Sequence, residues 1–336
     1  MQAVVFNETG EPAEVLECCD KPVPEPKSGE VRVRMLYSPI NPSDLMYIRG
    51  RYGIRAKLPA TPGFEGVGVV EASGGGLLGS FMKGKRVVVL NKDTGNWAEQ
   101  TVVPAKQAVP ISNDLPLEQA AMFFVNPATS YVMTREVLAV PEGGWLLQTA
   151  AGSALGRMII RLSKEYKFKT VNVVRREAQA AELKDLGADE VVVYDGNPEG
   201  REEFVRKVKE IVGKQGVKYA LDPVGGGTGS GVAETLGSGG RLVVYGSLSD
   251  QPIEVTPRQL ITQDVRVEGF WLSRHMQELS LFGKMRLVKK ITRLMREKIL
   301  QADVDHAYDL SQIKDAVRDS EAVGKSGKIL LKLGNE

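Results

Sequence analysis

An alternation of apolar strands and amphipathic helices runs from about residue 145 to residue 272, and it limits the folds open to this chain. The helices are predicted at 156–166, 177–187 and 202–213, and glycines end the last two. Because strands joined by helical crossovers run parallel, this series predicts an α/β fold with a Rossmann-type, doubly wound parallel sheet. The predicted strands lie at 145–150, 170–175, 190–195, 219–225, 241–247 and 265–272.

The first third of the chain has a different sequence pattern. Short β-branched segments at 31–37, 66–72, 85–90 and 99–105 are bounded by Gly, Pro or Asn, and long helices are missing. With 336 residues the chain is long enough for two domains. We therefore predict a β-rich catalytic domain over 1–125 and a Rossmann domain over 126–272.

The segment from about 273 to 336 is predicted to complete the first domain. It contains an amphipathic helix within 280–298, with Leu281, Met285, Val288 and Ile291 at near-helical spacing, and a last strand at 327–332.

Composition narrows the class of partner. A formal net charge of +2 gives no electrostatic reason to expect nucleic acid, and no apolar run approaches the ~18 residues of a membrane span. The two cysteines, Cys18 and Cys19, are adjacent and make a poor structural disulfide, which fits a reducing compartment. We expect a cytoplasmic protein that acts on a small molecule.

The turn after the first Rossmann strand, AAGSALG at 150–156, keeps only Gly156 of the usual dinucleotide-binding glycines in frame. It still leaves an apolar strand and opens a helix, where backbone N–H groups and the helix dipole suit a pyrophosphate. The second strand ends in Arg175 and Arg176, where an NAD enzyme has an acidic residue for the ribose hydroxyls. Since guanidinium binds a 2′-phosphate that a carboxylate would repel, we expect NADPH as the cofactor.

Two segments of the first domain carry a family resemblance. The order of NPSD at 41–44 and PGFEGVGVV at 62–70 resembles the medium-chain dehydrogenase/reductase superfamily, whose catalytic domain is GroES-like. The zinc-dependent alcohol dehydrogenases of that superfamily carry Cys where Asn41 stands and His where Phe64 stands. The resemblance therefore implies a zinc-free enzyme. His275 and His306 have no ligand spacing, and we expect no metal site.

Further segments look like the mitochondrial-type 2-enoyl thioester reductases. They are NPSDLMYIRGRYG at 41–53, VNPATSYVM at 125–133, TVNVVRR at 170–176, YGSL at 245–248 and GFWLS at 269–273. The resemblance implies that Tyr52 is the proton donor and that Asn126 contacts the nicotinamide end. It implies further cofactor contacts by Gly152, Ser153, Ala154, Leu155, Arg175, Arg176, Tyr245, Gly246, Ser247, Leu248, Phe270, Trp271, Leu272 and Lys328.

Three functions stay open at this point. The first is reduction of a 2-enoyl thioester by NADPH, with hydride added to the β-carbon and a proton to the α-carbon. The second is an NADPH:quinone oxidoreductase of the same superfamily. The third is a non-catalytic NADPH-binding sensor, which the altered AGSALG turn would suit. Phe270 and Trp271 also suit an interface, because a sixth-strand edge often pairs across a dimer, and we expect a homodimer.

Overall fold

The computed structural model describes residues 1–91, 93–322 and 327–335. The chain divides into two compact units, which are described separately. The first unit comprises Met1–Val125 and Ala302–Glu336, and the second comprises Asn126–Gln301. No helix in the described ranges is both long and apolar enough to cross a membrane.

The second unit contains a parallel sheet that has, among the described residues, six strands in the order β10-β9-β8-β11-β12-β13. This is the doubly wound order. The strands are added towards one side of the sheet from β8 to β10 and towards the other side from β11 to β13, so the strand order reverses between β8 and β11. The predicted strands are all present, and the α/β class is confirmed. Their bounds are β8 (Trp145–Gln148), β9 (Lys169–Val174), β10 (Glu190–Val193), β11 (Val217–Asp222), β12 (Leu236–Val244) and β13 (Arg266–Gly269).

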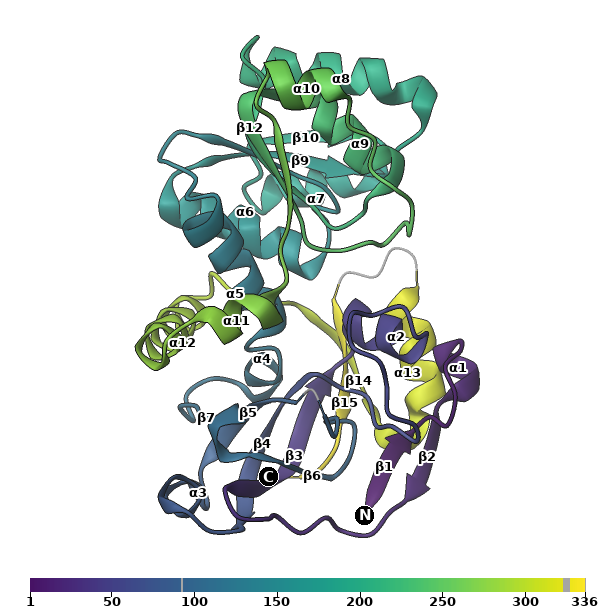
Figure 1. The fold of residues 1–336 in the computed structure, drawn as a ribbon, viewed down its shortest axis with the longest axis vertical. Coiled ribbons are helices and arrows are strands. Elements are labelled where there is room, and N and C mark those ends of the chain that lie inside the picture. Colours follow the sequence, from purple (N-terminus) through teal and green to yellow (C-terminus); the bar gives the residue numbers. More distant parts are fainter. Residues whose placement is uncertain (92, 323–326, 336) are drawn as a thin grey trace. The chain divides into compact units, whose positions relative to one another are not determined.

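Helices α6 to α9 lie around this sheet (Figure 1). One apolar cluster joins the strands to Phe204, Val208 and Val232 of α8 and α9, and a second includes Ile160 and Leu183 of α6 and α7. The helices of the unit are α5 (Val125–Val132), which continues into the π-helix η2 (Met133–Val137), α6 (Ala154–Tyr166), η3 (Glu177–Gln179), α7 (Ala180–Asp185), α8 (Pro198–Val212), α9 (Gly226–Thr235), α10 (Pro257–Thr262), α11 (Leu272–Glu278) and α12 (Leu281–Arg296).

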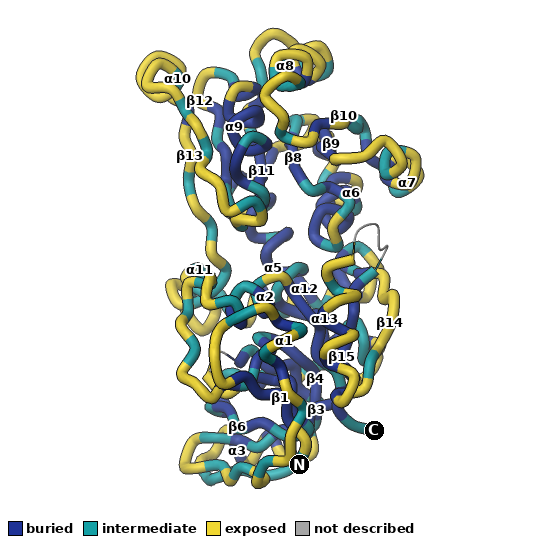
Figure 2. The backbone as a smooth tube through the Cα atoms, turned by 90° about the vertical axis from the view of Figure 1, so that its right-hand side faces the viewer, coloured by how far each residue is buried: buried dark blue, intermediate teal, exposed yellow. Residues whose placement is uncertain are grey.

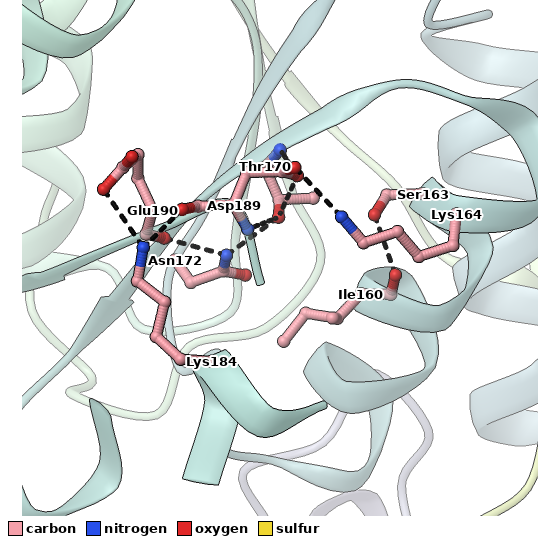
Figure 3. A network of polar contacts seen from close by, with 8 residues as sticks. All are labelled: Ile160, Ser163, Lys164, Thr170, Asn172, Lys184, Asp189 and Glu190. Atoms are coloured by element: carbon pink, nitrogen blue, oxygen red, sulfur yellow. Dashed lines mark hydrogen bonds and ion pairs between the residues drawn. The ribbon is translucent and has the colours of Figure 1, made fainter. Parts of the chain in front are cut away.

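A polar network around Asp189 joins the amino-terminal ends of β9 and β10 (Figure 3). One carboxylate oxygen accepts the backbone N–H of Thr170 at 2.9 Å, and the other contacts the Lys164 ammonium at 2.9 Å. Asn172 donates to the Thr170 hydroxyl and to the Glu190 carbonyl. These contacts fix β9 against β10 at the sheet edge opposite to the one that carries Arg175.

The first unit is built on a mixed sheet in the described order β14-β15-β3-β4-β5-β7, with β6 paired to β3. β14 runs parallel to β15, and the other pairs of this sheet are antiparallel. Its buried strands β3, β4 and β15 are dark in Figure 2. The predicted β-rich domain and the returning last strand are both present. The strands are β1 (Gln2–Val5), β2 (Glu17–Asp20), β3 (Glu30–Pro39), β4 (Glu65–Ser73), β5 (Arg86–Leu90), β6 (Gln100–Pro104), β7 (Ala108–Pro110), β14 (Val304–Asp309) and β15 (Lys328–Lys332).

Short helices complete this unit. They are α1 (Pro12–Val15), α2 (Pro42–Ile48), α3 (Leu77–Met82), η1 (Ala105–Gln107), α4 (Leu117–Ala121), η4 (Leu310–Gln312) and α13 (Ile313–Glu321). Asn41 is the N-cap of α2, and its backbone N–H donates to the Asp44 carboxylate at 2.8 Å. This start of α2 places Asn41 and Asp44 inside the unit, where both are buried.

Two sequence expectations need correction. The chain returns to the first unit at Ala302 and not near 273, because α11 and α12 group with the second unit, where Arg293 pairs with Glu165. The apolar face of α12 also differs from the predicted one. Leu287, Ile291, Leu294 and Met295 are buried, whereas Leu281 and Met285 are exposed.

Candidate functional site

The turn between β8 and α6 has the form of an anion site. Ser153 is the N-cap of α6, and its hydroxyl accepts the N–H of Gly156 at 3.1 Å. A Cβ at Gly156 would lie 2.5 Å from the Ala151 carbonyl oxygen, so only glycine allows helix and strand to approach this closely. The thirteen-residue helix directs its N-terminal dipole at this turn, which suits a phosphate. The helix therefore still has a capped N-terminus, although Ala154 and Leu155 stand in its first turn.

Arg157, in the first turn of α6, is a buried cation that stabilises this turn. Its Nε donates to the Gly152 carbonyl at 3.2 Å, and its Nη2 lies 2.7 Å from a Glu182 carboxylate oxygen on α7. A cation near a helix N-terminus opposes the dipole, so these partners must hold it there. Arg157 thereby joins the turn at Gly152 to the helix that follows Arg175 and Arg176.

Arg175 and Arg176 follow the last residue of β9 directly, and both are exposed. Arg175 lines a cavity of about 240 Å³ together with Tyr194, Asp195 and Lys207. In the described part of the chain, neither arginine forms an ion pair with a carboxylate. Both guanidinium groups are therefore available to an anion.

Asp222, which was not among the predicted site residues, lies at the end of β11, where the strand order reverses. Its carboxylate accepts the Thr149 hydroxyl, the N–H of Val224 at 3.1 Å and the N–H of Gly225 at 2.7 Å. Burial raises the pKa of this carboxyl. Ligands of doubly wound sheets bind at such a reversal. The signal was present in the sequence, as an acidic residue ending an apolar strand before Pro223 and Gly225.

Two further predicted segments follow the carboxyl ends of β12 and β13. The Tyr245 N–H donates to the Asp222 carbonyl at 3.0 Å, and the Leu248 N–H donates to the Pro223 carbonyl at 3.0 Å. The Phe270 N–H donates to the Val244 carbonyl at 2.8 Å, while Trp271 is partly exposed. Because parallel strands end at one edge, the structure brings these segments and the turn at 150–156 to the same edge of the sheet.

The remaining predicted residues lie elsewhere. Asn126 is the second residue of α5, at the start of the second unit. Tyr52 belongs to the first unit, where its half-buried ring packs on Phe64 with a centroid separation of 5.2 Å. Lys328, on β15, also belongs to the first unit and is buried. How Tyr52, Asn126 and Lys328 serve the site stays a prediction.

A buried polar cluster surrounds Asn41 in the first unit. The Asn41 side-chain oxygen accepts a hydrogen bond from the Lys328 ammonium at 2.6 Å, and the side-chain nitrogen donates one to a Glu65 oxygen at 2.9 Å. Asp44 accepts the N–H groups of Asn41 and Phe64. Burial raises the pKa of Glu65. Burial also raises the pKa of Asp44 to about 7, although its two N–H partners and the charge of Lys328 stabilise the ionised form.

The residues at the two zinc-ligand positions do not fit zinc. The Asn41 oxygen already accepts a hydrogen bond from a cation, and Phe64 offers no ligand atom. Within the described ranges, no group of three or more His, Cys, Asp or Glu side chains could hold a metal ion. His275 instead lies 3.3 Å from a Glu136 oxygen, and His306 packs on the Tyr308 ring.

Comparison with known proteins agrees with this architecture. Residues 27–113 match the family described as alcohol dehydrogenase GroES-like domain, and residues 154–285 match the family described as zinc-binding dehydrogenase. The mitochondrial enoyl-[acyl-carrier-protein] reductase of Caenorhabditis elegans is 34% identical over 317 residues, which cover 90% of each chain.

Solved structures give the same result. A putative NADPH:quinone reductase from Bacillus thuringiensis superposes with a TM-score of 0.90 at 31% identity, covering 99% of each chain. The Etr1p/NADP/crotonyl-CoA complex superposes with a TM-score of 0.82 at 26% identity, covering 98% of this chain and 99% of the other. Similarity over nearly the whole length, together with the two matched domains, shows that the chain belongs to the medium-chain dehydrogenase/reductase superfamily of oxidoreductases, with the enoyl-[acyl-carrier-protein] reductases among its relatives.

Proposed function

We propose that this chain catalyses the NADPH-dependent reduction of a 2-enoyl thioester. Bound NADPH would supply the hydride that adds to the β-carbon, and the α-carbon would take a proton. The observation that carries this proposal is the pair Arg175 and Arg176 at the end of β9, on the same sheet edge as the Ser153-capped start of α6. This pair suits a 2′-phosphate, and the helix start suits the pyrophosphate.

The proposed NADPH site extends along this edge. We assign Gly152, Ser153, Ala154 and Leu155 to the pyrophosphate. The segments Tyr245–Leu248 and Phe270–Leu272 are assigned to the nicotinamide half together with Asn126. In support, each of these segments follows a strand of the parallel sheet or begins a helix of the same unit.

Tyr52 is our proposed proton donor. A tyrosine hydroxyl is protonated at neutral pH in its unperturbed state, so it can quench the charge left on the thioester enolate. Tyr52→Phe keeps the ring that packs on Phe64 and removes the hydroxyl. We expect the rate of crotonyl-CoA reduction to fall by about 10²–10⁴-fold, with NADPH affinity near wild type.

Tyr47→Phe is the matched control, because Tyr47 packs on the same Phe64 ring with a centroid separation of 5.3 Å. It should reduce crotonyl-CoA at close to the wild-type rate. A Tyr52→Phe variant with near-normal crotonyl-CoA reduction removes Tyr52 from the mechanism.

NADPH:quinone oxidoreduction is the second candidate, and the similarity to the Bacillus thuringiensis structure favours it. A reduced quinone can take its protons from water, so Tyr52→Phe should leave quinone turnover unchanged. Parallel assays with NADPH and either crotonyl-CoA or 1,4-naphthoquinone separate the two candidates. A protein that binds NADPH and turns over neither acceptor would be the non-catalytic sensor.

We also propose that the chain forms a homodimer in the cytoplasm. The exposed edge strand β13, with Val267 on it and Ile261 of α10 before it, supports pairing with a second copy. The free cysteines Cys18 and Cys19 support a reducing compartment. The Caenorhabditis elegans relative is named as a mitochondrial enzyme, so location is best tested by fractionation.

A further inference from the structure

The Asn41 side chain uses both ends of its amide within the buried cluster. Its oxygen accepts the Lys328 ammonium at 2.6 Å, and its nitrogen donates to Glu65 Oε1 at 2.9 Å. Asn41 and Glu65 are only 1% and 2% exposed, and Lys328 is 7% exposed. The Lys328 ammonium also donates to the Ile40 carbonyl at 2.7 Å. A buried cation is therefore linked to a buried carboxylate through one amide.

The second oxygen of Glu65 leaves this cluster and contacts the backbone at the start of α5. Glu65 Oε2 accepts the N–H of Phe124 at 3.0 Å and the N–H of Val125 at 2.9 Å. The first N–H groups of a helix lack partners within the helix, and a carboxylate there is stabilised by the helix dipole. Val125 begins α5 and is the last residue of the first unit. Glu65 thus fixes the point at which the chain leaves that unit.

We propose that Glu65 is a positioning residue, held by Asn41 and Lys328, that fixes the start of α5 and thereby places Asn126 for the nicotinamide end of the cofactor. Asn126 is the next residue after Val125, so the anchored N–H groups limit where its backbone can lie. The placement of the nicotinamide rests on the proposed function, whereas the anchor itself does not.

In this arrangement Lys328 orients Asn41 and does not contact the cofactor. Its ammonium already donates to Ile40 and Asn41, and its charge faces the buried carboxylates Glu65 and Asp44. Removing a cation that balances buried carboxylates leaves uncompensated charge. Lys328 acts in the first unit, through Asn41 and Glu65, on the geometry of residues 124–126.

Hydrogen exchange tests the anchor without any turnover. Glu65→Gln keeps the shape of the side chain but replaces one accepting oxygen with an N–H₂ donor. We expect the N–H groups of Phe124 and Val125 to exchange at least tenfold faster in this variant. Lys332→Met is the matched control, because Lys332 is the exposed lysine of the same strand β15 and should change neither rate. Unchanged exchange at both positions in Glu65→Gln overturns the anchor.

A double-mutant cycle tests the effect on Asn126. In single-turnover reduction of crotonyl-CoA, Glu65→Gln should slow hydride transfer at least tenfold and leave the Kd of NADPH within about threefold. In an Asn126→Ala background it should cause no further loss, because it acts through Asn126. If the rate losses of Glu65→Gln and Asn126→Ala multiply in the double variant, Glu65 does not act through Asn126. That result, or an Asn126→Ala variant as fast as wild type, overturns the proposed placement of Asn126.

If Glu65→Gln does not fold, hydrogen exchange and single-turnover reduction are measured on Lys328→Met instead. This variant removes the cation that orients Asn41. The control Lys332→Met is unchanged. A wild-type protein that oxidises NADPH with neither crotonyl-CoA nor 1,4-naphthoquinone contradicts the proposed function, while the exchange rates of Phe124 and Val125 still decide the anchor.

Discussion

The two arginines after β9 allow a direct measurement of cofactor choice. Arg175→Ala and Arg176→Ala each remove a guanidinium that has no carboxylate partner among the described residues. Both side chains are exposed, so neither substitution opens a cavity in the core. The loss should therefore appear in ligand binding and leave thermal stability near wild type.

The size of the loss follows from the exposure of the site. Hydrogen bonds to charged groups contribute about 1.5–3 kcal/mol when sheltered, and solvent lowers this at an exposed site. We expect about 1–3 kcal/mol per arginine, which is about a 5- to 150-fold increase in the Kd of NADPH. Arg175 should account for more than Arg176, because it also lines the cavity beside Tyr194.

Titration of intrinsic NADPH fluorescence, in parallel with NADH, measures the effect. NADH lacks the 2′-phosphate, so its Kd should change by less than about twofold, within the error of such small interaction energies. Added salt should weaken NADPH binding to the wild type more than to Arg175→Ala, because the interaction is exposed. Arg258→Ala on α10 serves as the exposed control. Equal losses for both cofactors, or no loss for either, refute the assignment of the arginines to the 2′-phosphate.

Three further predictions concern other parts of the molecule. Folded Asp44, with a pKa of about 7, keeps a proton that the unfolded chain releases near 3.8. The wild-type free energy of unfolding should therefore fall as pH rises from 4 to 7, by at most about 1.4 kcal/mol per pH unit, and Asp44→Asn should lack this slope in chemical denaturation. Arg157→Met should raise the Kd of both NADPH and NADH by about tenfold, since it frees the Gly152 carbonyl; a change confined to NADPH would contradict this. Val267→Lys should shift the protein to monomer in sedimentation velocity, and an unaltered dimer would argue against pairing through β13.

Much of the second unit follows from local sequence pattern. Apolar strands such as 170–175, and helices ended by Gly187 and Gly213, determine the order of elements, and the parallel sheet follows from that order. The position of Arg175 and Arg176 directly after the second strand, on which their proposed cofactor role rests, follows from the same order. These features depend on neighbours in sequence, which is why they could be predicted.

Other features depend on contacts that sequence spacing does not show. α9 was not predicted, because its glycines disfavour a helix and leave no apolar period. The structure requires those glycines: a Cβ at Gly227 would lie 2.1 Å from the Gly196 carbonyl oxygen, and one at Gly231 would lie 2.8 Å from the Tyr194 ring. The buried Lys328 ammonium was likewise hidden, because its partners Ile40 and Asn41 lie almost 290 residues earlier in the chain.

The insertion of the second unit within the first affects how the protein folds during synthesis. Residues 126–301 form one continuous segment, so the whole parallel sheet can assemble while the first unit still lacks β15. Until Lys328 leaves the ribosome, Asp44 and Glu65 have no ammonium beside them, and the edge of β3 that pairs with β15 stays open. The first unit of the nascent chain therefore stays incomplete until β15 pairs with β3, and the same step brings the Lys328 ammonium to Asn41.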